Sequence, residues 1–206
     1  MGFGLLLIGF FFACVMSLIP SLYFAMLWGY PMIIIALYRL ASYHVRFKYT
    51  FFVSFASLPF AVYFSLAALR DWGVEGWLKS FVDSSFSIVE PCYIVFYTFF
   101  FFLVLYSIAG LAGELRLLSV QSSAWRNVIV LGFYVLLDLV YRVASPQIAE
   151  NQLEPYFALP ALLLKVAFLL LTVWLIFQCY RKIASEDEDV SMPEFGFKKK
   201  KKEKKK

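Results

Sequence analysis

The chain has 206 residues, of which 62% are hydrophobic and only 16% are charged. Soluble globular domains average about half apolar and about a quarter charged residues, so this composition excludes an ordinary soluble domain and favours a membrane protein. The formal net charge is +5, but eight of the 19 basic residues are lysines among the last nine positions. At about 20 residues per membrane crossing, the length suits one transmembrane domain over residues 1–183 and a tail over residues 184–206.

Six apolar runs are long enough to be membrane spans, at residues 3–19, 22–40, 50–69, 87–112, 127–145 and 156–180. Only Ile19-Pro20-Ser21 divides the first two. Proline removes a backbone donor and disfavours helix at the residue before it, so a tight hairpin is expected there, with a single kinked helix as the alternative. The predicted fold class is therefore all-α, a polytopic integral membrane bundle of about six transmembrane helices.

Charges beside the runs predict the orientation of the chain. Basic residues that flank membrane spans stay in the cytoplasm. They cluster after the second run, around the loop after the fourth and after the sixth, as Arg39, Arg46, Lys48, Arg116, Arg126, Arg181 and Lys182. The first intervening loop contains Asp71, Glu75 and Asp83 against Arg70 and Lys79, and the second contains Glu150 and Glu154 with no basic residue. An even number of crossings with both termini inside satisfies every loop.

The loop after the third run contains a candidate surface helix. Its apolar residues recur at helical spacing, as Val74, Trp77, Leu78, Phe81 and Val82, with charged residues on the other faces. This pattern predicts a short helix that lies on the extracytoplasmic surface of the membrane. A simple interfacial anchor is the favoured interpretation, and a lid over a cavity is the alternative.

Small residues recur on one face of three runs. Helices in lipid associate through such residues because they let the backbones approach closely. The stripes are Gly9, Ala13 and Ser17 in the first run, Ser57, Ala61 and Ser65 in the third, and Ala109 and Gly113 in the fourth. We expect packing surfaces within the bundle, while a homodimer face remains the alternative.

Four ionisable residues fall inside apolar runs, namely Glu90, Asp138, Arg142 and Lys165. Charges in hydrocarbon are costly and usually face a partner or a wet cavity, so these are the candidate site residues. Asp138 and Arg142 are four residues apart, which places both on one helix face. From the helical rise of about 1.5 Å per residue, Asp138 lies roughly 10 Å and Lys165 roughly 13 Å below the outer ends of their runs.

Tyrosines accompany these charges. Tyr93 and Tyr97 continue the helical face of Glu90, and Tyr134 flanks Asp138. We therefore predict a polar, tyrosine-lined pocket in the outer half of the bundle, formed by the fourth to sixth runs. It would bind a zwitterionic or amphiphilic ligand, or a lipid headgroup. In the alternative interpretation, Asp138, Arg142 and Lys165 neutralise one another and only fix helix register.

Signatures of catalysis are few. His44, the only histidine, sits among basic residues, and only Cys179 falls at the same predicted membrane face as a potential thiol partner. The chain contains no Gly-x-Ser-x-Gly elbow, zinc-binding His-Glu-x-x-His helix or phosphate-binding loop. Its three cysteines are scattered, without metal-ligand spacing. We predict no catalytic residues, cofactor or metal site, and rank a membrane enzyme third among the possible functions.

The tail changes composition abruptly, from the acidic run Glu186-Asp187-Glu188-Asp189 to a block of lysines. Such a segment builds no hydrophobic core and is expected to be disordered. Each lysine near an anionic membrane surface contributes about 1 kcal/mol, so the block should bind anionic lipid headgroups rather than nucleic acid. The proposed surface-binding residues are Lys198, Lys199, Lys200, Lys201, Lys202, Lys204, Lys205 and Lys206.

The leading functional hypothesis is a non-enzymatic membrane protein that binds a small ligand, lipid or partner protein within the bilayer, as in a transporter subunit. The second is a structural or assembly protein, homo-oligomeric or bound to a membrane partner, whose tail recruits lipid or a cytosolic partner. The six-span layout resembles small bacterial integral membrane proteins of several unrelated kinds, including vitamin-binding transporter subunits. That resemblance implies the bacterial cytoplasmic membrane.

Overall fold

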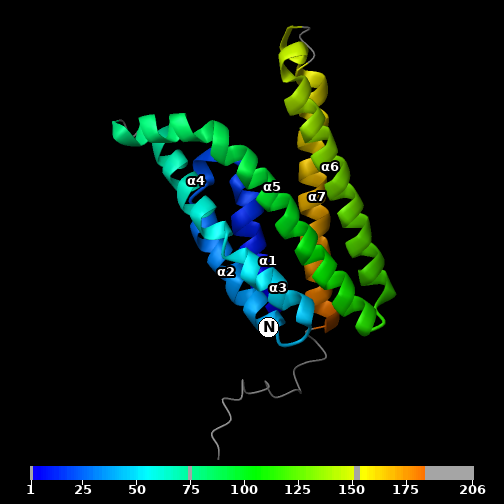
Figure 1. The fold of residues 1–206 in the computed structure, drawn as a ribbon. Coiled ribbons are helices and arrows are strands. Elements are labelled where there is room, and N and C mark those ends of the chain that lie inside the picture. Colours follow the sequence, from blue (N-terminus) through cyan, green and yellow to red (C-terminus); the bar gives the residue numbers. More distant parts are fainter. Residues whose placement is uncertain (1, 74–75, 151–153, 184–206) are drawn as a thin grey trace, which may run out of the picture.

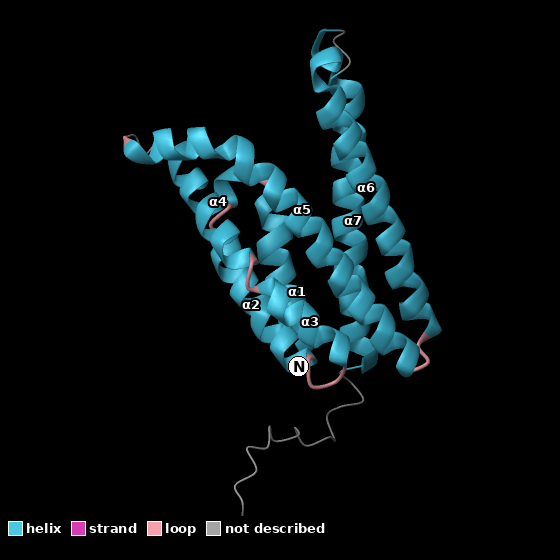
Figure 2. Cartoon of the chain, viewed as in Figure 1, coloured by secondary structure: helices cyan, strands magenta, loops and turns pink. Residues whose placement is uncertain are grey.

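A computed structural model describes residues 2–73, 76–150 and 154–183, and over these residues the chain is helical, with no strands (Figure 2). The predicted all-α class is confirmed. The helices run up and down in a bundle (Figure 1). The predicted tail, including its lysines, lies outside the described residues.

The N-terminal segment is a helical hairpin. Helix α1 (Gly2–Phe10) continues through a π-helical turn, η1 (Phe11–Val15), and a 3₁₀ turn, η2 (Met16–Leu18), before a second 3₁₀ turn, η3 (Pro20–Leu22), and helix α2 (Ala25–Leu40). The backbone at Ile19 is extended, with φ −104° and ψ 115°, as expected before proline. Helices α1 and α2 pack against each other, so the hairpin is present and the single kinked helix is not.

Small residues permit this hairpin to close tightly. A Cβ atom added at Gly29 of α2 would lie 2.3 Å from the backbone nitrogen of Ala13, and one added at Gly9 would lie 2.9 Å from the carbonyl oxygen of Gly29. Neither position tolerates a larger residue without movement of the backbone. The predicted use of Gly9 and Ala13 for packing within the bundle is thus confirmed, and their burial removes them from any homodimer face.

The third apolar run forms two helices, α3 (Val45–Ser54) and α4 (Ser57–Asp71), separated by a turn at Phe55 and Ala56. Pro59 lies in the first turn of α4. Because it has no N–H, it cannot donate to the carbonyl of Phe55, which accepts instead from the backbone nitrogen of Leu58 at 3.2 Å. A hydrogen bond of 2.9 Å between the hydroxyls of Thr50 and Ser107 joins α3 to the long helix α5.

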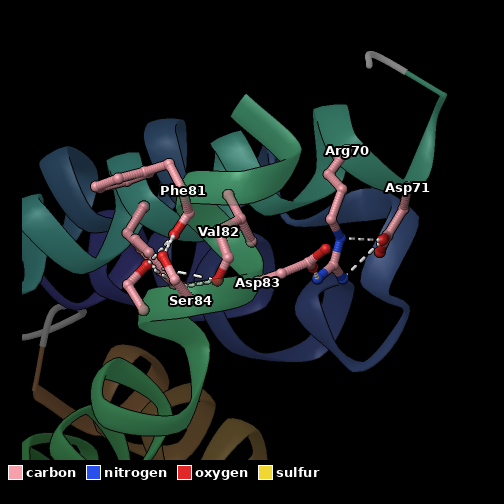
Figure 3. Close-up of polar contacts among 8 residues, drawn as sticks. Arg70, Asp71, Phe81, Val82, Asp83 and Ser84 are labelled. Carbon is pink, nitrogen blue, oxygen red and sulfur yellow. Dashed lines mark hydrogen bonds and ion pairs between the residues drawn. The ribbon is translucent and has the colours of Figure 1, made fainter. Parts of the chain in front are cut away.

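Helix α5 (Trp77–Glu114) corrects the prediction of a separate surface helix. The described part of that predicted helix forms the first turns of α5, which starts across the top of the molecule and then turns down into the bundle (Figure 1). Near the change of direction, the hydroxyls of Ser84 and Ser85 donate to the carbonyl of Phe81 at 3.0 and 2.6 Å (Figure 3). Serines bonded back to the preceding turn often bend helices. Pro91, six residues after Ser85, also removes one backbone hydrogen bond from α5.

The start of α5 is tied to the end of α4 by charge. The Arg70 guanidinium donates to Asp71 at 2.8 Å and to Asp83 at 2.9 Å (Figure 3). These partly exposed pairs lie at the end of the bundle that the acidic loops predict to be extracytoplasmic. They orient the first turns of α5 over α4.

Two long helices, α6 (Leu118–Glu150) and α7 (Glu154–Ile183), complete the bundle. They lie side by side, with α6 also packed on α5 and α7 on α1 (Figure 1). Within the described residues, four helical segments are long and apolar enough to cross a membrane, namely Val45–Asp71, Trp77–Glu114, Leu118–Arg142 and Ala158–Ile183. Gly2–Leu18 and Ala25–Leu40 are apolar but shorter, so six crossings remain a prediction.

Cysteine labelling tests the predicted orientation. In a chain with Cys14, Cys92 and Cys179 replaced by alanine, Ser42→Cys and Ser80→Cys place single thiols at exposed positions near opposite ends of the bundle. We expect an impermeant maleimide to label the Ser80 variant in intact cells and the Ser42 variant only after permeabilisation. The reverse pattern would show the opposite orientation, and labelling of both from one side would contradict the crossing by α3 and α4.

Candidate polar cavity

A cavity of about 290 Å³ opens between the N-terminal hairpin and helices α4 to α7. All seven predicted site residues line it: Glu90, Tyr93 and Tyr97 from α5, Tyr134, Asp138 and Arg142 from α6, and Lys165 from α7. The remaining lining residues are Cys14, Ser17, Tyr23, Met26, Phe64, Phe86, Ile94, Tyr141, Ala158, Ala161 and Leu162. The structure therefore brings every predicted residue to one place, and adds a wall that the sequence did not indicate.

An ion bridge crosses one side of this cavity. The Nε atom of Arg142 donates to Asp138 at 2.8 Å within α6, and its Nη2 atom donates to Glu90 of α5 at 3.1 Å. The intrahelical pair expected from the four-residue spacing is present. Glu90 is the partner that links the two helices. All three side chains are at least partly shielded from solvent, which strengthens their attraction.

Lys165 lies outside this bridge. It is partly buried and lines the same cavity, but its ammonium makes no hydrogen bond or ion pair with any residue in the described part of the chain. The predicted neutralising network of Asp138, Arg142 and Lys165 is therefore not a set of direct contacts. With all groups ionised, the Glu90–Arg142–Asp138 bridge has one net negative charge and Lys165 one positive charge, so the cavity is neutral overall but polarised.

Several tyrosines line the cavity. The hydroxyls of Tyr93 and Tyr30 are 2.9 Å apart, and Tyr30, on α2, is fully buried. The ring of Tyr93 packs edge-on against Phe64, with the ring centroids 4.7 Å apart. The Tyr97 side chain is only 7% exposed, and its buried hydroxyl has no hydrogen-bond partner among the described residues. A buried hydroxyl without a partner is destabilising, so this group is available to a bound molecule.

The N-terminal hairpin supplies the wall that was missed. Cys14 lies in the π-helical turn and Ser17 in the 3₁₀ turn after it, and Tyr30 supports Tyr93 from behind. A tyrosine within the second apolar run was the available signal for Tyr30. Nothing in the sequence indicated that the first run would leave regular α-helical geometry beside a site on α5.

The one histidine–thiol pair considered from the sequence, His44 and Cys179, does not line this cavity. Among the described residues, no group of three or more His, Cys, Asp and Glu residues could hold a metal ion. His44 caps α3 by accepting from the backbone nitrogen of Arg46 at 3.0 Å, and its other ring nitrogen lies 3.2 Å from Glu114. Cys179 is fully buried. Glu90 and Asp138 are bridged by a guanidinium, unlike carboxyl pairs that share a proton.

No protein family, curated protein or solved structure matches the chain. Its class rests on its own features. It is an all-helical protein whose long helices are compatible with a membrane and which encloses a polar cavity among them.

The ion bridge predicts a defined effect on stability. In Arg142→Met, Glu90 and Asp138 lose the cation between them, and we expect the melting temperature to fall by about 5 °C. The further changes Glu90→Gln and Asp138→Asn in the same chain should restore most of this loss. The control is Arg126→Met, at an exposed position on the same helix, which should melt like the wild type. Thermal unfolding in detergent measures all of these, and an unchanged Arg142→Met would contradict the role of the bridge.

Proposed function

We propose that this protein is a non-enzymatic, polytopic membrane protein that binds a zwitterionic amphiphile through its polar cavity. The observation that carries the proposal is the Lys165 ammonium, which faces the cavity without a direct partner among the described residues. An ionised group in hydrocarbon is costly, and the cost falls when an opposite charge or water is supplied. The anionic group of a ligand would supply that charge.

The rest of the cavity suits the other end of such a ligand. The Glu90–Arg142–Asp138 bridge has an excess negative charge and would attract an ammonium group. The Tyr97 hydroxyl offers a hydrogen bond. At about 290 Å³, the cavity is near the lower limit of typical ligand sites, which begin at about 300 Å³, so it would accommodate a headgroup rather than a whole lipid.

The proposal includes a topology. Six crossings with both termini inside place the cavity toward the extracytoplasmic side, because Glu90 and Arg142 lie near the same end of the bundle as the α4–α5 turn. The bacterial cytoplasmic membrane is the proposed location, on the resemblance of the six-span layout alone.

Ligand-dependent thermal stability tests the binding site. The probe is dioctanoyl phosphatidylethanolamine, a zwitterionic phospholipid, added to the detergent-solubilised protein. At a hundredfold excess over Kd, a ligand that binds only the folded state adds about 2.7 kcal/mol, which corresponds to roughly 5 to 10 °C for a chain of this size. We expect Lys165→Met to abolish the shift and Tyr97→Phe to reduce it.

Lys79→Met, at an exposed position at the start of α5, is the matched control and should keep the full shift. An equal shift in wild type and Lys165→Met, or no shift in the wild type, would refute the proposal. If Lys165→Met fails to fold, the structural and assembly alternative is favoured instead.

The lysine block supports a second, separate activity at the cytoplasmic face. The described end of α7 carries Arg181 and Lys182 just before the tail, and Lys182 donates to Ser119 at 2.8 Å. The eight lysines that follow at the end of the chain would add to this basic surface. We propose that they bind anionic lipid headgroups.

Deleting residues 198–206 should weaken this interaction. The protein, reconstituted in neutral phosphatidylcholine nanodiscs, should bind separate liposomes that contain anionic lipid, and the deletion should remove most of that binding. Raising the salt concentration should have the same effect in the full chain, because the attraction is electrostatic. Binding that persists in the deletion variant would contradict a role for the lysines.

A further inference from the structure

A second pocket, an apolar groove, lies on the face of α5 and α6 that points away from the bundle. It has a volume of about 550 Å³ and is walled almost entirely by apolar side chains, including Val95, Phe99 and Phe102 of α5 and Val128, Val135 and Leu139 of α6. Val95, Phe99 and Leu139 are exposed in the bundle, so this groove faces outward.

The groove and the polar cavity meet. Ile94, Asp138 and Arg142 line both of them, so the ion bridge stands at their junction. A molecule with its charged end in the cavity and its apolar end in the groove would therefore lie across these three residues.

The groove is long enough for one acyl chain. From Pro91 beside the ion bridge to Phe102 at the far end, α5 advances roughly 16 Å at about 1.5 Å per residue. Half of the hydrocarbon thickness is about 15 Å. On α6, the lining residues from Val128 to Arg142 extend over roughly 21 Å on the same basis, so both walls are long enough for one acyl chain.

A glycine keeps the groove open. Gly132 lies inside α6, where glycine destabilises a helix by about 1 kcal/mol relative to alanine. A Cβ atom added there would have no neighbour within 4 Å. At Gly9 and Gly29, by contrast, the close packing of α1 and α2 leaves no room for a Cβ atom. Packing therefore does not explain Gly132. A larger side chain at this position would project into the groove instead.

We infer that the groove holds an acyl chain of the same molecule whose headgroup occupies the cavity, so that the ligand is a zwitterionic phospholipid that enters sideways from the membrane between α5 and α6. This inference rests on the proposed function and specifies its ligand class. Moving a chain from lipid into an apolar groove changes its hydrophobic energy little. The cavity therefore provides the affinity, and the groove selects and positions a molecule that has a chain.

Cross-linking from within the membrane tests the inference. The full chain is reconstituted in phosphatidylcholine liposomes that contain a trace of phosphatidylethanolamine with a diazirine in its acyl chain, and labelled residues are mapped by mass spectrometry. We expect labelling of segments 94–102 and 128–139 to exceed labelling of Leu159 and Leu163, on the exposed face of α7, several-fold. Gly132→Phe should remove this excess. Leu136→Phe, an exposed position of α6 that does not line the groove, should retain it.

The results of this experiment distinguish a failure of the acyl-chain inference from a failure of the proposed headgroup site. Equal labelling of the groove and the α7 face would mean that the groove holds only bulk lipid and would overturn the inference. A thermal shift abolished by Lys165→Met, together with labelling unaffected by Gly132→Phe, would also overturn it while leaving the headgroup site intact. Excess labelling that survives Lys165→Met would contradict the assignment of headgroup and chain to one molecule.

Discussion

The Arg142 guanidinium, shared between Asp138 of its own helix and Glu90 of α5, is the interaction on which the site depends. Carboxylates placed among apolar helices are costly unless a cation is close. One guanidinium serves two of them here, because its planar fork of donors can point in two directions at once. The bridge connects α5 to α6 where the polar cavity and the apolar groove adjoin, and Lys165 lines the cavity outside this bridge.

The N-terminal hairpin provides the opposite wall through a different physical device. Contact between Gly29 and Ala13 brings α1 and α2 very close, and the chain departs from α-helical geometry between Phe11 and Leu18 beside the cavity. Irregular backbone within a membrane bundle is tolerated where it is buried in protein or lines a cavity, and π-helical turns are frequent at functional sites. The hydrogen bond between Tyr30 and Tyr93 then connects this wall to α5.

The charged residues of the cavity lie at the depths that helical spacing predicts, but their partners do not follow from that spacing. Counting residues from the ends of apolar runs placed Asp138 and Lys165 at similar depths, and both line the cavity, because the rise of a helix converts sequence position directly into depth. The same counting did not reveal that Glu90 would pair with Arg142 or that Lys165 would stand apart. Those outcomes depend on how each helix is rotated about its axis, which is set by contacts with its neighbours. The prediction of a separate surface helix was wrong because nothing in the sequence ends the helix between Asp83 and Pro91, so these turns continue into α5.

Composition and periodicity by themselves determined that the chain is helical and apolar, where its apolar helices lie and which side chains have chemistry to offer, because these properties are local or additive along the chain. Only the tertiary structure decided the partner of each charge, the wall supplied by the hairpin and the groove kept open at Gly132. Those features depend on distances between helices that are remote in sequence. In an apolar bundle, close contact of small residues and a few polar bonds choose among many arrangements of similar hydrophobic energy.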